Sequence, residues 1–420
     1  MHFQFLLSFP LRGGPPSQDP ILSDTVPIPT VRAPRPRERL SCQRVSIQKM
    51  ATIPSKHRAL VLNSTRDPLD ISLVEQAAPQ AGPGSVVIRV LAAAVLSYAE
   101  EVYSGRKPYP YPTPFIPGSS AIGRVAAVGP DATLLKPGQL VYFDCYIVGR
   151  DDPTSLILHG LNSGPTPGSR LLIEGEWRDS TYAEYAKVPL ENCFPLDESR
   201  LLGNLKYQVE DLMYLGAMSV PFGGLNDVGV KAGEKVIVAP ATGSFGRAAV
   251  VVALAMGARV VAMGRNTEAL KRLQAINPDR VSIVQNTGDV EADTKALTAD
   301  GPADVFFDIS PREAVSSTHL QSCISALRRE GRVSLMGGQL ELVPMPIRTI
   351  MRYNLKVCGK WMYTKEDIRT LITLVETGYL KLGESGGIKT ATKFSLEQFA
   401  DAFETAAKNS GLGVPTVITP

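Results

Sequence analysis

The chain has 420 residues, of which 44% are hydrophobic and 20% charged, and its formal net charge is +3. This length allows two domains with a sizeable core, and the composition is that of a soluble globular protein. The weak net charge excludes the basic face of a nucleic-acid-binding protein, and no apolar run reaches the roughly 18 residues of a membrane-spanning helix. The five cysteines are scattered without CxxC or zinc-ribbon spacing, which indicates reduced thiols in a cytoplasmic protein.

Residues 1–49 differ in composition from the rest of the chain. They hold eight prolines, seven Lys or Arg and three Asp or Glu, with no sustained hydrophobic periodicity. We expect this extension to be disordered, because such a composition buries too little apolar surface. A further hypothesis is that translation begins at Met50. A targeting segment is the less favoured alternative, because prolines interrupt the amphipathic helix of a transit peptide.

Residues 50–200 predict a β-rich domain. Runs of aliphatic and β-branched residues alternate with Pro-Gly turns, which is typical of a small antiparallel barrel. The predicted strands cover residues 57–62, 71–75, 85–94, 121–128 and 139–145. A long segment follows at 146–181, and we expect it near the cleft or an oligomer contact. Its His159 is a candidate acid–base group, although an ordinary surface or hydrogen-bonded histidine is the favoured interpretation.

Residues 235–266 have the pattern of a nucleotide-binding βαβ unit. A buried strand, a turn of small residues, an Ala/Val-rich helix and a second strand follow one another within about 30 residues. Glycines let the backbone approach a pyrophosphate, and the helix N-terminus attracts its charge. An ordinary crossover with a tight turn is the alternative. The candidate cofactor-binding residues of the turn are Thr242, Gly243, Ser244, Phe245 and Gly246.

The end of the second strand predicts which nucleotide binds. NAD-binding enzymes usually carry an acidic residue about 20 positions after the glycine turn. Here Gly264, Arg265 and Asn266 occupy this place, so no carboxylate repels a 2′-phosphate. Arg265 can pair with such a phosphate through its planar guanidinium, which predicts NADP(H) as the cofactor. The alternative is that Arg265 is only a solvated residue at a strand end.

Strand and helix signals alternate through the rest of residues 201–380. They predict a doubly wound parallel sheet of six strands, and therefore an α/β fold. Ligands of such sheets bind beyond the carboxyl ends of the strands, which makes Gly337 and Gly338 candidates for cofactor contact. Turn glycines without a ligand are an equal alternative. Further strands are predicted at 281–284, 304–309, 332–336 and 355–359, and helices at 206–216, 267–275, 290–299, 318–329 and 365–376.

The ordered set of motifs resembles the medium-chain dehydrogenase/reductase superfamily. The matching segments are PGSVVIRV at 83–90, PGSSAIGRV at 117–125, KPG at 136–138, YAEY at 182–185, KAGEKV at 231–236 and the nucleotide turn. The resemblance covers about residues 55–420. It implies a GroES-like catalytic domain at 50–200, a Rossmann NADP-binding domain at 201–380, and a return to the catalytic domain at 381–420. That last segment is predicted to hold a helix at 396–408 and a strand at 414–418, where subunits of a possible homodimer meet.

The departures from the family pattern concern its zinc ligands. Leu96 stands where zinc-dependent members have cysteine, Ser119 and Ser120 stand where they have His-Glu, and no cysteine lies near Gly216. Leucine cannot bind zinc, and serine hydroxyls are poor ligands for it. The chain therefore resembles the zinc-free branch of quinone oxidoreductases and enoyl reductases, and no metal site is predicted.

Without a metal, hydrogen-bond donors must stabilise charge on the substrate. By the resemblance, Tyr98 is the first candidate proton donor, with Ser97 beside it and Ser119 and Ser120 next; a packing role for Tyr98 is at least as well supported. The predicted function is an NADPH-dependent oxidoreductase that transfers hydride to a quinone, enone or carbonyl compound. The alternatives are a trans-acting enoyl reductase of a polyketide pathway and a catalytically silent nucleotide-binding protein. The partner is a small-molecule substrate of unidentified structure.

Overall fold

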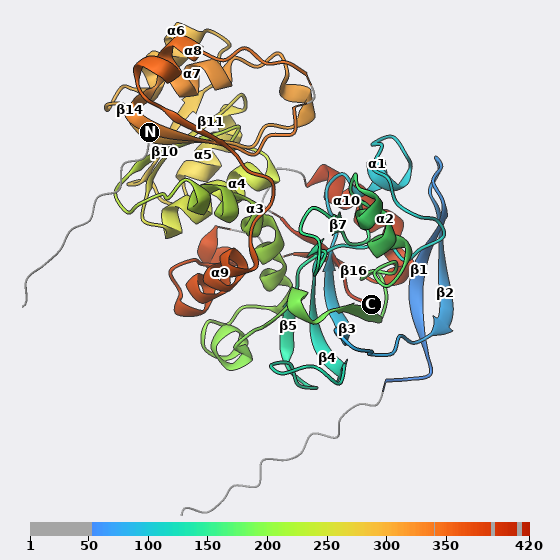
Figure 1. Cartoon of the computed structure of the whole chain (residues 1–420). Helices are drawn as coiled ribbons and strands as arrows, with labels where there is room; N and C mark the ends of the chain where they lie inside the picture. Colours follow the sequence, from blue (N-terminus) through green and yellow to red (C-terminus); the bar gives the residue numbers. More distant parts are fainter. Residues whose placement is uncertain (1–52, 340, 388–390, 410–413) are drawn as a thin grey trace, which may run out of the picture. The chain divides into compact units, whose positions relative to one another are not determined.

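The computed structural model describes residues 53–339, 341–387, 391–409 and 414–420. The expectations for residues 1–49 lie outside this part of the chain. The α/β fold class is confirmed: a β-rich region precedes an α/β region, and the end of the chain returns to the β-rich sheet (Figure 1). No helix of the described segments is long and apolar enough to cross a bilayer.

The β-rich region is built on a sheet in the order β16-β17-β3-β4-β5-β9, with β8 also paired to β3. Its pairs are antiparallel except for β16 with β17. Strand β17 lies between β16 and β3, so the strand expected at a subunit contact has no open backbone edge. The bounds are β3 Ser85–Ala94, β4 Ala121–Val128, β5 Leu140–Phe143, β8 Tyr185–Pro189, β9 Cys193–Pro195, β16 Thr392–Phe394 and β17 Thr416–Ile418.

Shorter elements surround this sheet. Strands β1 and β2 form an antiparallel hairpin, and so do β6 and β7 within the long segment 146–181. That segment has a small apolar core of its own, formed by Ile147, Ile157, Ile173 and Trp177. The bounds are β1 Lys56–Ser64, β2 Asp70–Ala77, α1 Ala99–Tyr103, β6 Tyr146–Val148, β7 Leu156–Leu158, α2 Pro167–Glu174 and α10 Phe399–Lys408.

The α/β region contains a six-stranded parallel sheet in the order β12-β11-β10-β13-β14-β15, as the Rossmann prediction requires. Successive strands are added to one side of the sheet from β10 to β12 and to the other side from β13 to β15. Such sheets bind ligands where the strand order reverses, here between β10 and β13. The strands are β10 Lys235–Ala239, β11 Arg259–Gly264, β12 Val281–Gln285, β13 Ala303–Asp308, β14 Leu327–Leu335 and β15 Lys356–Gly359. The helices are α3 Tyr214–Asp227, α4 Ser244–Ala255, α5 Thr267–Gln274, α6 Val290–Leu297, α7 His319–Ser325, α8 Ile347–Arg352 and α9 Lys365–Thr377.

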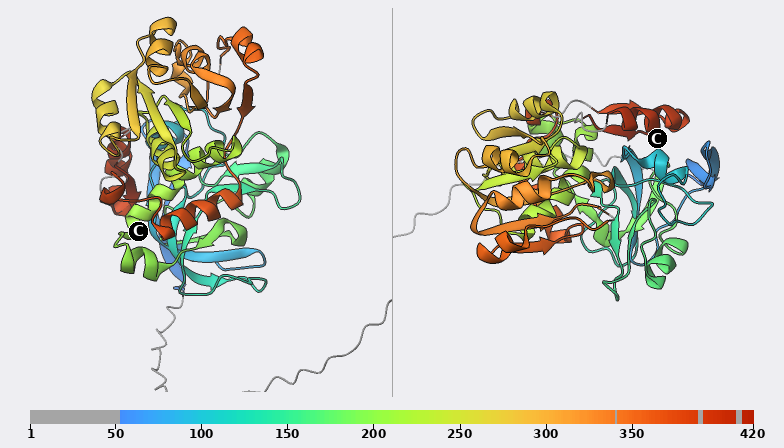
Figure 2. Two further views of the ribbon diagram at one scale, coloured as in Figure 1. Left: turned by 90° about the vertical axis from the view of Figure 1, so that its left-hand side faces the viewer. Right: turned by 90° about the horizontal axis from the view of Figure 1, so that it is seen from above.

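Helices cover both faces of this sheet, as the two views in Figure 2 show. Alternate residues of β10 point to opposite faces, since side chains of a strand alternate. Val236 and Val238 pack with α3, α4 and α5, whereas Ile237 packs with α6 and α7. This double burial explains why β10 is a continuous apolar run.

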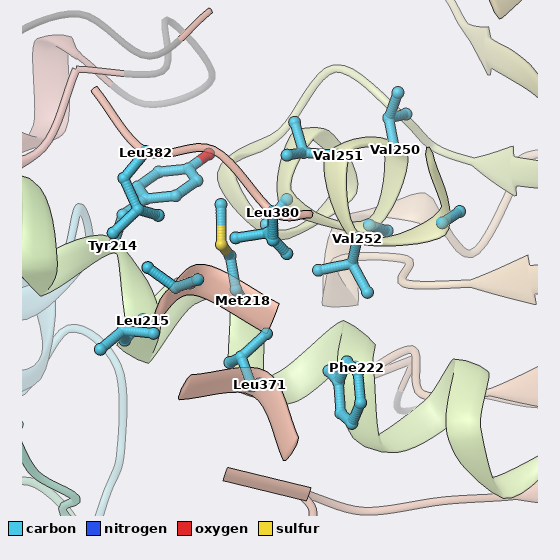
Figure 3. Close-up of a cluster of buried hydrophobic side chains, with 14 of the residues drawn as sticks. Tyr214, Leu215, Met218, Phe222, Val250, Val251, Val252, Leu371, Leu380 and Leu382 are labelled. Carbon is cyan, nitrogen blue, oxygen red and sulfur yellow. The ribbon is translucent and has the colours of Figure 1, made fainter. Parts of the chain in front are cut away.

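Helix α3 differs from the prediction, which placed a helix at 206–216. A short 3₁₀ turn at Val209–Met213 precedes α3, and the helix continues to Asp227. Pro221 and three glycines lie inside it and lower its helix propensity, so tertiary packing stabilises the helix. Met218 and Phe222 belong to a buried cluster that includes side chains of α4 and α9 (Figure 3).

Helix α7 is shorter than predicted. The expected helix at 318–329 ends at Ser325, and Leu327 already pairs with Ala303 of the neighbouring strand. The helical propensity at this point is overridden because Leu327 begins the strand that pairs with β13. Helices α1, α2 and α8, with five, eight and six residues, had no sequence prediction.

Candidate active site

The turn between β10 and α4 places its two glycines in different surroundings. Gly243 is the N-cap of α4 in an extended conformation, and a Cβ atom added to it would meet nothing within 4 Å. A Cβ added to Gly246 would lie 2.2 Å from the carbonyl oxygen of Pro240, so the helix packs directly on the turn. The open space at Gly243, at the N-terminus of a 12-residue helix, fits the pyrophosphate of a dinucleotide.

The end of β11 lies beside this turn. A Cβ atom added to Gly264 would be 3.0 Å from Cγ2 of Thr242, so the Thr242 side chain packs directly on the Gly264 backbone. Asn266 is the N-cap of α5, and its side chain accepts a hydrogen bond from the Ala269 amide at 3.0 Å. Arg265 is exposed and carries the only charge of the three residues. Arg265 is therefore the one that could recognise a 2′-phosphate.

A buried hydrogen-bond network joins the carboxyl ends of β13 and β14. Nε2 of His319 is 2.7 Å from Oγ of Ser310 and 3.1 Å from Oδ1 of Asp308. The Gly337 amide donates to the same carboxylate at 3.2 Å, and the Gly338 amide donates to the Ser310 carbonyl at 2.8 Å. The two predicted glycines are thus held at the edge where the sheet binds ligands. No sequence motif had marked His319 as a site residue.

A pocket lies between strands of the β-rich sheet and the first turn of α4. The β-rich side contributes the candidate catalytic residues Ser97, Tyr98, Ser119 and Ser120. Ser244 and Phe245 contribute from α4, and Tyr363 contributes from the loop before α9. The other predicted cofactor residues do not line this pocket. The structure therefore brings the candidate catalytic groups together with the start of the candidate cofactor-binding helix.

Tyr98 presents a neutral phenol to this pocket. It precedes α1 and is half-buried, and burial raises the pKa of its hydroxyl well above 10. Nζ of Lys107 lies 4.0 Å from the centroid of its ring, close enough for a cation–π interaction that fixes the ring. A protonated, oriented phenol can donate a hydrogen bond to a substrate oxygen.

The positions matched with zinc ligands line the same pocket but do not fit zinc. Leu96 and Gly216 offer no donor atom. The hydroxyl of Ser119 donates to a backbone carbonyl at 2.8 Å, and Oγ of Ser120 accepts from the Cys145 amide at 3.2 Å. Burial raises the pKa of the Cys145 thiol to about 12, so it is protonated. Across the described residues, no three His, Cys, Asp or Glu side chains could together hold a metal ion.

His159 is not placed for acid–base chemistry. It is fully buried, and Nδ1 lies 3.3 Å from Oγ of Ser180. Burial lowers the pKa of its imidazole to about 3, which keeps the ring neutral. His159 also lies outside the pocket lining.

A pair that the sequence did not reveal lies at the pocket wall. Oη of Tyr363 donates to Oδ1 of Asp144 at 2.6 Å. Asp144 is 1% exposed, and burial raises the pKa of its carboxyl to about 7, against the opposing effect of the Tyr363 hydrogen bond. The two residues are 219 positions apart, so no local motif joins them.

Comparisons with known proteins agree with this architecture. Residues 82–198 match the family described as alcohol dehydrogenase GroES-like domain, and residues 245–377 match the family described as zinc-binding dehydrogenase. The alcohol dehydrogenase of Geobacillus stearothermophilus is 26% identical over 84% of this chain and 96% of its own length. The quinone oxidoreductase of Homo sapiens is 24% identical over 78% of this chain and 86% of its own.

The fold also matches that of a thermostable alcohol dehydrogenase from Pyrobaculum aerophilum. The TM-score is 0.65 at 24% sequence identity, over 87% of this chain and all of the other. The order of the two matched families follows the β-rich and α/β regions of the structure. These matches support the resemblance of the chain to oxidoreductases of the medium-chain dehydrogenase/reductase superfamily.

Proposed function

We propose that this protein is an NADPH-dependent, zinc-independent reductase of quinones, enones or other carbonyl compounds. The proposal is supported chiefly by the pocket in which Tyr98 and Ser120 face the first turn of α4. The positions of the usual zinc ligands lie in this pocket and carry no side chain suited to zinc.

A bound nicotinamide cofactor would supply a hydride to the substrate. The space at Gly243 and the N-terminus of α4 would receive its pyrophosphate. Arg265 would pair with the 2′-phosphate that distinguishes NADPH from NADH, and no acidic residue stands beside it at the strand end.

The protein's own part is to orient the substrate and to stabilise charge on its oxygen. The neutral phenol of Tyr98 donates a hydrogen bond to that oxygen as negative charge develops on it. The apolar side chains of Leu96, Leu158 and Val220 line the pocket and exclude water from the reacting atoms.

The test is NADPH oxidation against a panel of quinones, enones and ketones, with and without a metal chelator. We expect turnover that the chelator leaves unchanged and that is slower with NADH. Inhibition by chelator contradicts zinc independence, and equal rates with NADH contradict the role of Arg265. Nucleotide binding without turnover on any acceptor favours a silent nucleotide-binding protein.

A matched pair of variants tests the role of Tyr98. Tyr98→Phe removes the hydroxyl and keeps the ring, so kcat should fall while the Kd for NADPH is unchanged. Tyr353→Phe is the control, because Tyr353 is 43% exposed and lies outside the pocket lining.

A further inference from the structure

Tyr363 stands between a buried carboxyl group and the pocket. Tyr363 is one of the residues that line the pocket, as are Tyr98 and Ser120, and its hydroxyl donates a hydrogen bond to Oδ1 of Asp144. Asp144 follows β5 of the β-rich sheet, whereas Tyr363 precedes α9 of the α/β region. The pair therefore joins the two regions of the chain at the candidate active site.

We propose that Asp144 and Tyr363 form a proton relay that delivers a proton to the substrate oxygen in this pocket. The relay rests on the reductase function proposed above and adds a proton source to it. Tyr98 then binds and orients the oxygen, and Tyr363 donates the proton.

No cation forms an ion pair with Asp144 within the described residues. Its carboxyl is bonded to the Tyr363 hydroxyl and the Tyr146 amide, and Lys365 at the start of α9 acts on it only from a distance. A buried carboxylate without a paired cation is costly, so the protonated form is favoured. The other ionisable groups that face this carboxyl are Tyr142 and Cys145 of the β5 segment, the hydroxyl of Tyr146, and Cys193 of β9.

The geometry lets a protonated Asp144 act through Tyr363. When Asp144 carries a proton, its O–H donates to Oη of Tyr363, and the phenol proton is released to point into the pocket. Among the neighbours of Tyr98 in the described part of the chain there is no carboxyl group: they are the ammonium of Lys107, the ring of Tyr109 and the thiol of Cys145. Proton supply therefore distinguishes the two tyrosines.

In the proposed step the substrate gains one hydride and one proton. Hydride bonds to the carbonyl carbon of the substrate while the carbonyl π bond breaks towards oxygen, and NADPH is oxidised to NADP⁺. The oxygen takes the proton of the Tyr363 hydroxyl, and Tyr363 takes the proton of Asp144. Asp144 is left as a carboxylate and regains a proton from solvent before the next turnover.

The kinetic test compares the pH profiles of wild type, Asp144→Asn, Tyr363→Phe and a control, Tyr146→Phe. Asparagine keeps a hydrogen-bond partner for Tyr363 but supplies no proton. We expect wild-type kcat to fall tenfold per pH unit above about pH 7, as the carboxyl loses its proton. The first two variants should lower kcat by about 100-fold at pH 6, within the range of general acid catalysis, and should abolish this fall. Tyr146→Phe should keep the wild-type profile, because its hydroxyl is not bonded to the Asp144 carboxyl.

An infrared titration gives a second measurement that does not depend on turnover. The difference between wild type and Asp144→Asn should show the band of a protonated carboxyl that disappears as the pH rises through about 7. Tyr363→Phe should shift this band. A carboxyl that is ionised throughout this range overturns the relay.

The outcomes separate the relay from the reductase function. If wild type turns over a substrate, and Asp144→Asn and Tyr363→Phe keep its kcat and pH profile, the relay is overturned and the reductase function stands. Absence of wild-type turnover on every acceptor overturns the reductase function and the relay with it. If Tyr363→Phe fails to fold, the kinetics of Asp144→Asn and the infrared titration still test the relay.

Discussion

The two glycines of the α4 turn should respond to alanine in opposite ways. In Gly246→Ala the new Cβ would lie 2.2 Å from the carbonyl oxygen of Pro240 and 2.9 Å from Cα of Ala241, both backbone atoms. Relief requires the helix to move from the turn, and overpacking of this kind costs about 1–3 kcal/mol. We therefore expect Tm to fall by several degrees.

Gly243→Ala should leave the stability of the protein unchanged and weaken cofactor binding. Its φ of −78° and ψ of 171° suit alanine, and the new Cβ has open space. The entropy lost by the unfolded chain stabilises the variant by about 0.4–1 kcal/mol. The weaker N-cap costs a similar amount, about 1 kcal/mol or less. The methyl group would occupy the place predicted for the pyrophosphate, so the Kd for NADPH should rise at least about tenfold, or about 1.4 kcal/mol.

Thermal denaturation without cofactor, followed by fluorescence titration with NADPH, measures both effects. A Gly243→Ala variant that binds NADPH as wild type does would show that the pyrophosphate lies elsewhere. A Gly246→Ala variant with wild-type Tm would show that the close approach of helix and turn is not required. A lower Tm in both variants would refute the difference in packing that we assign to the two glycines.

Three other predictions follow from the same site. Arg265→Ala should raise the Kd for NADPH about tenfold, about 1.4 kcal/mol, and leave that for NADH unchanged; equal weakening of both contradicts 2′-phosphate recognition. Burial raises the pKa of Asp144 in the folded state from 3.8 to about 7. The contribution of the protonated carboxyl to the stability of the folded protein is therefore complete below pH 3.8 and is lost as the pH rises to about 7. The free energy of unfolding of Asp144→Asn, measured with urea, should therefore rise by up to about 4 kcal/mol relative to that of wild type between pH 4 and pH 8. Parallel curves of unfolding free energy against pH for the two proteins would contradict this. The raised thiol pKa of Cys145 should prevent its alkylation by iodoacetamide at pH 8, as read by mass spectrometry, while the half-buried Cys358 reacts.

The sequence predicts the elements whose local pattern and packing agree. Strand β3 occupies residues 85–94 as predicted, and β10 is the buried strand predicted at the start of residues 235–266. Helix α3 was missed because Pro221 and two adjacent glycines lower its propensity. The same glycines suit the packed position: a Cβ on Gly224 would lie 2.7 Å from Cε2 of Phe307 in β13 and 2.9 Å from Oγ of Ser334 in β14, so glycine lets α3 approach these strands. Packing of this kind has no local sequence signal.

The same limit applies to the site. The α4 turn could be predicted because its residues are consecutive, and Tyr98 because the family pattern marks its place. The Tyr363–Asp144 pair could not, since it forms only when β5 and the loop before α9 meet. His159 looked like a candidate for its chemical type alone, and its complete burial decides against it.

The residues that replace zinc ligands and the neutral acids of the pocket are physically linked. A zinc ion would favour ionised groups around it, because its charge lowers the pKa of neighbouring acids. Leu96 and two serines bring no such charge, and the pocket is largely apolar. Burial then raises the pKa values of Tyr98 and Asp144 and keeps both protonated at or below neutral pH. Substitutions that introduce a metal or a positive charge here should therefore favour ionisation of Tyr98 and Asp144, and so remove the proposed proton donors.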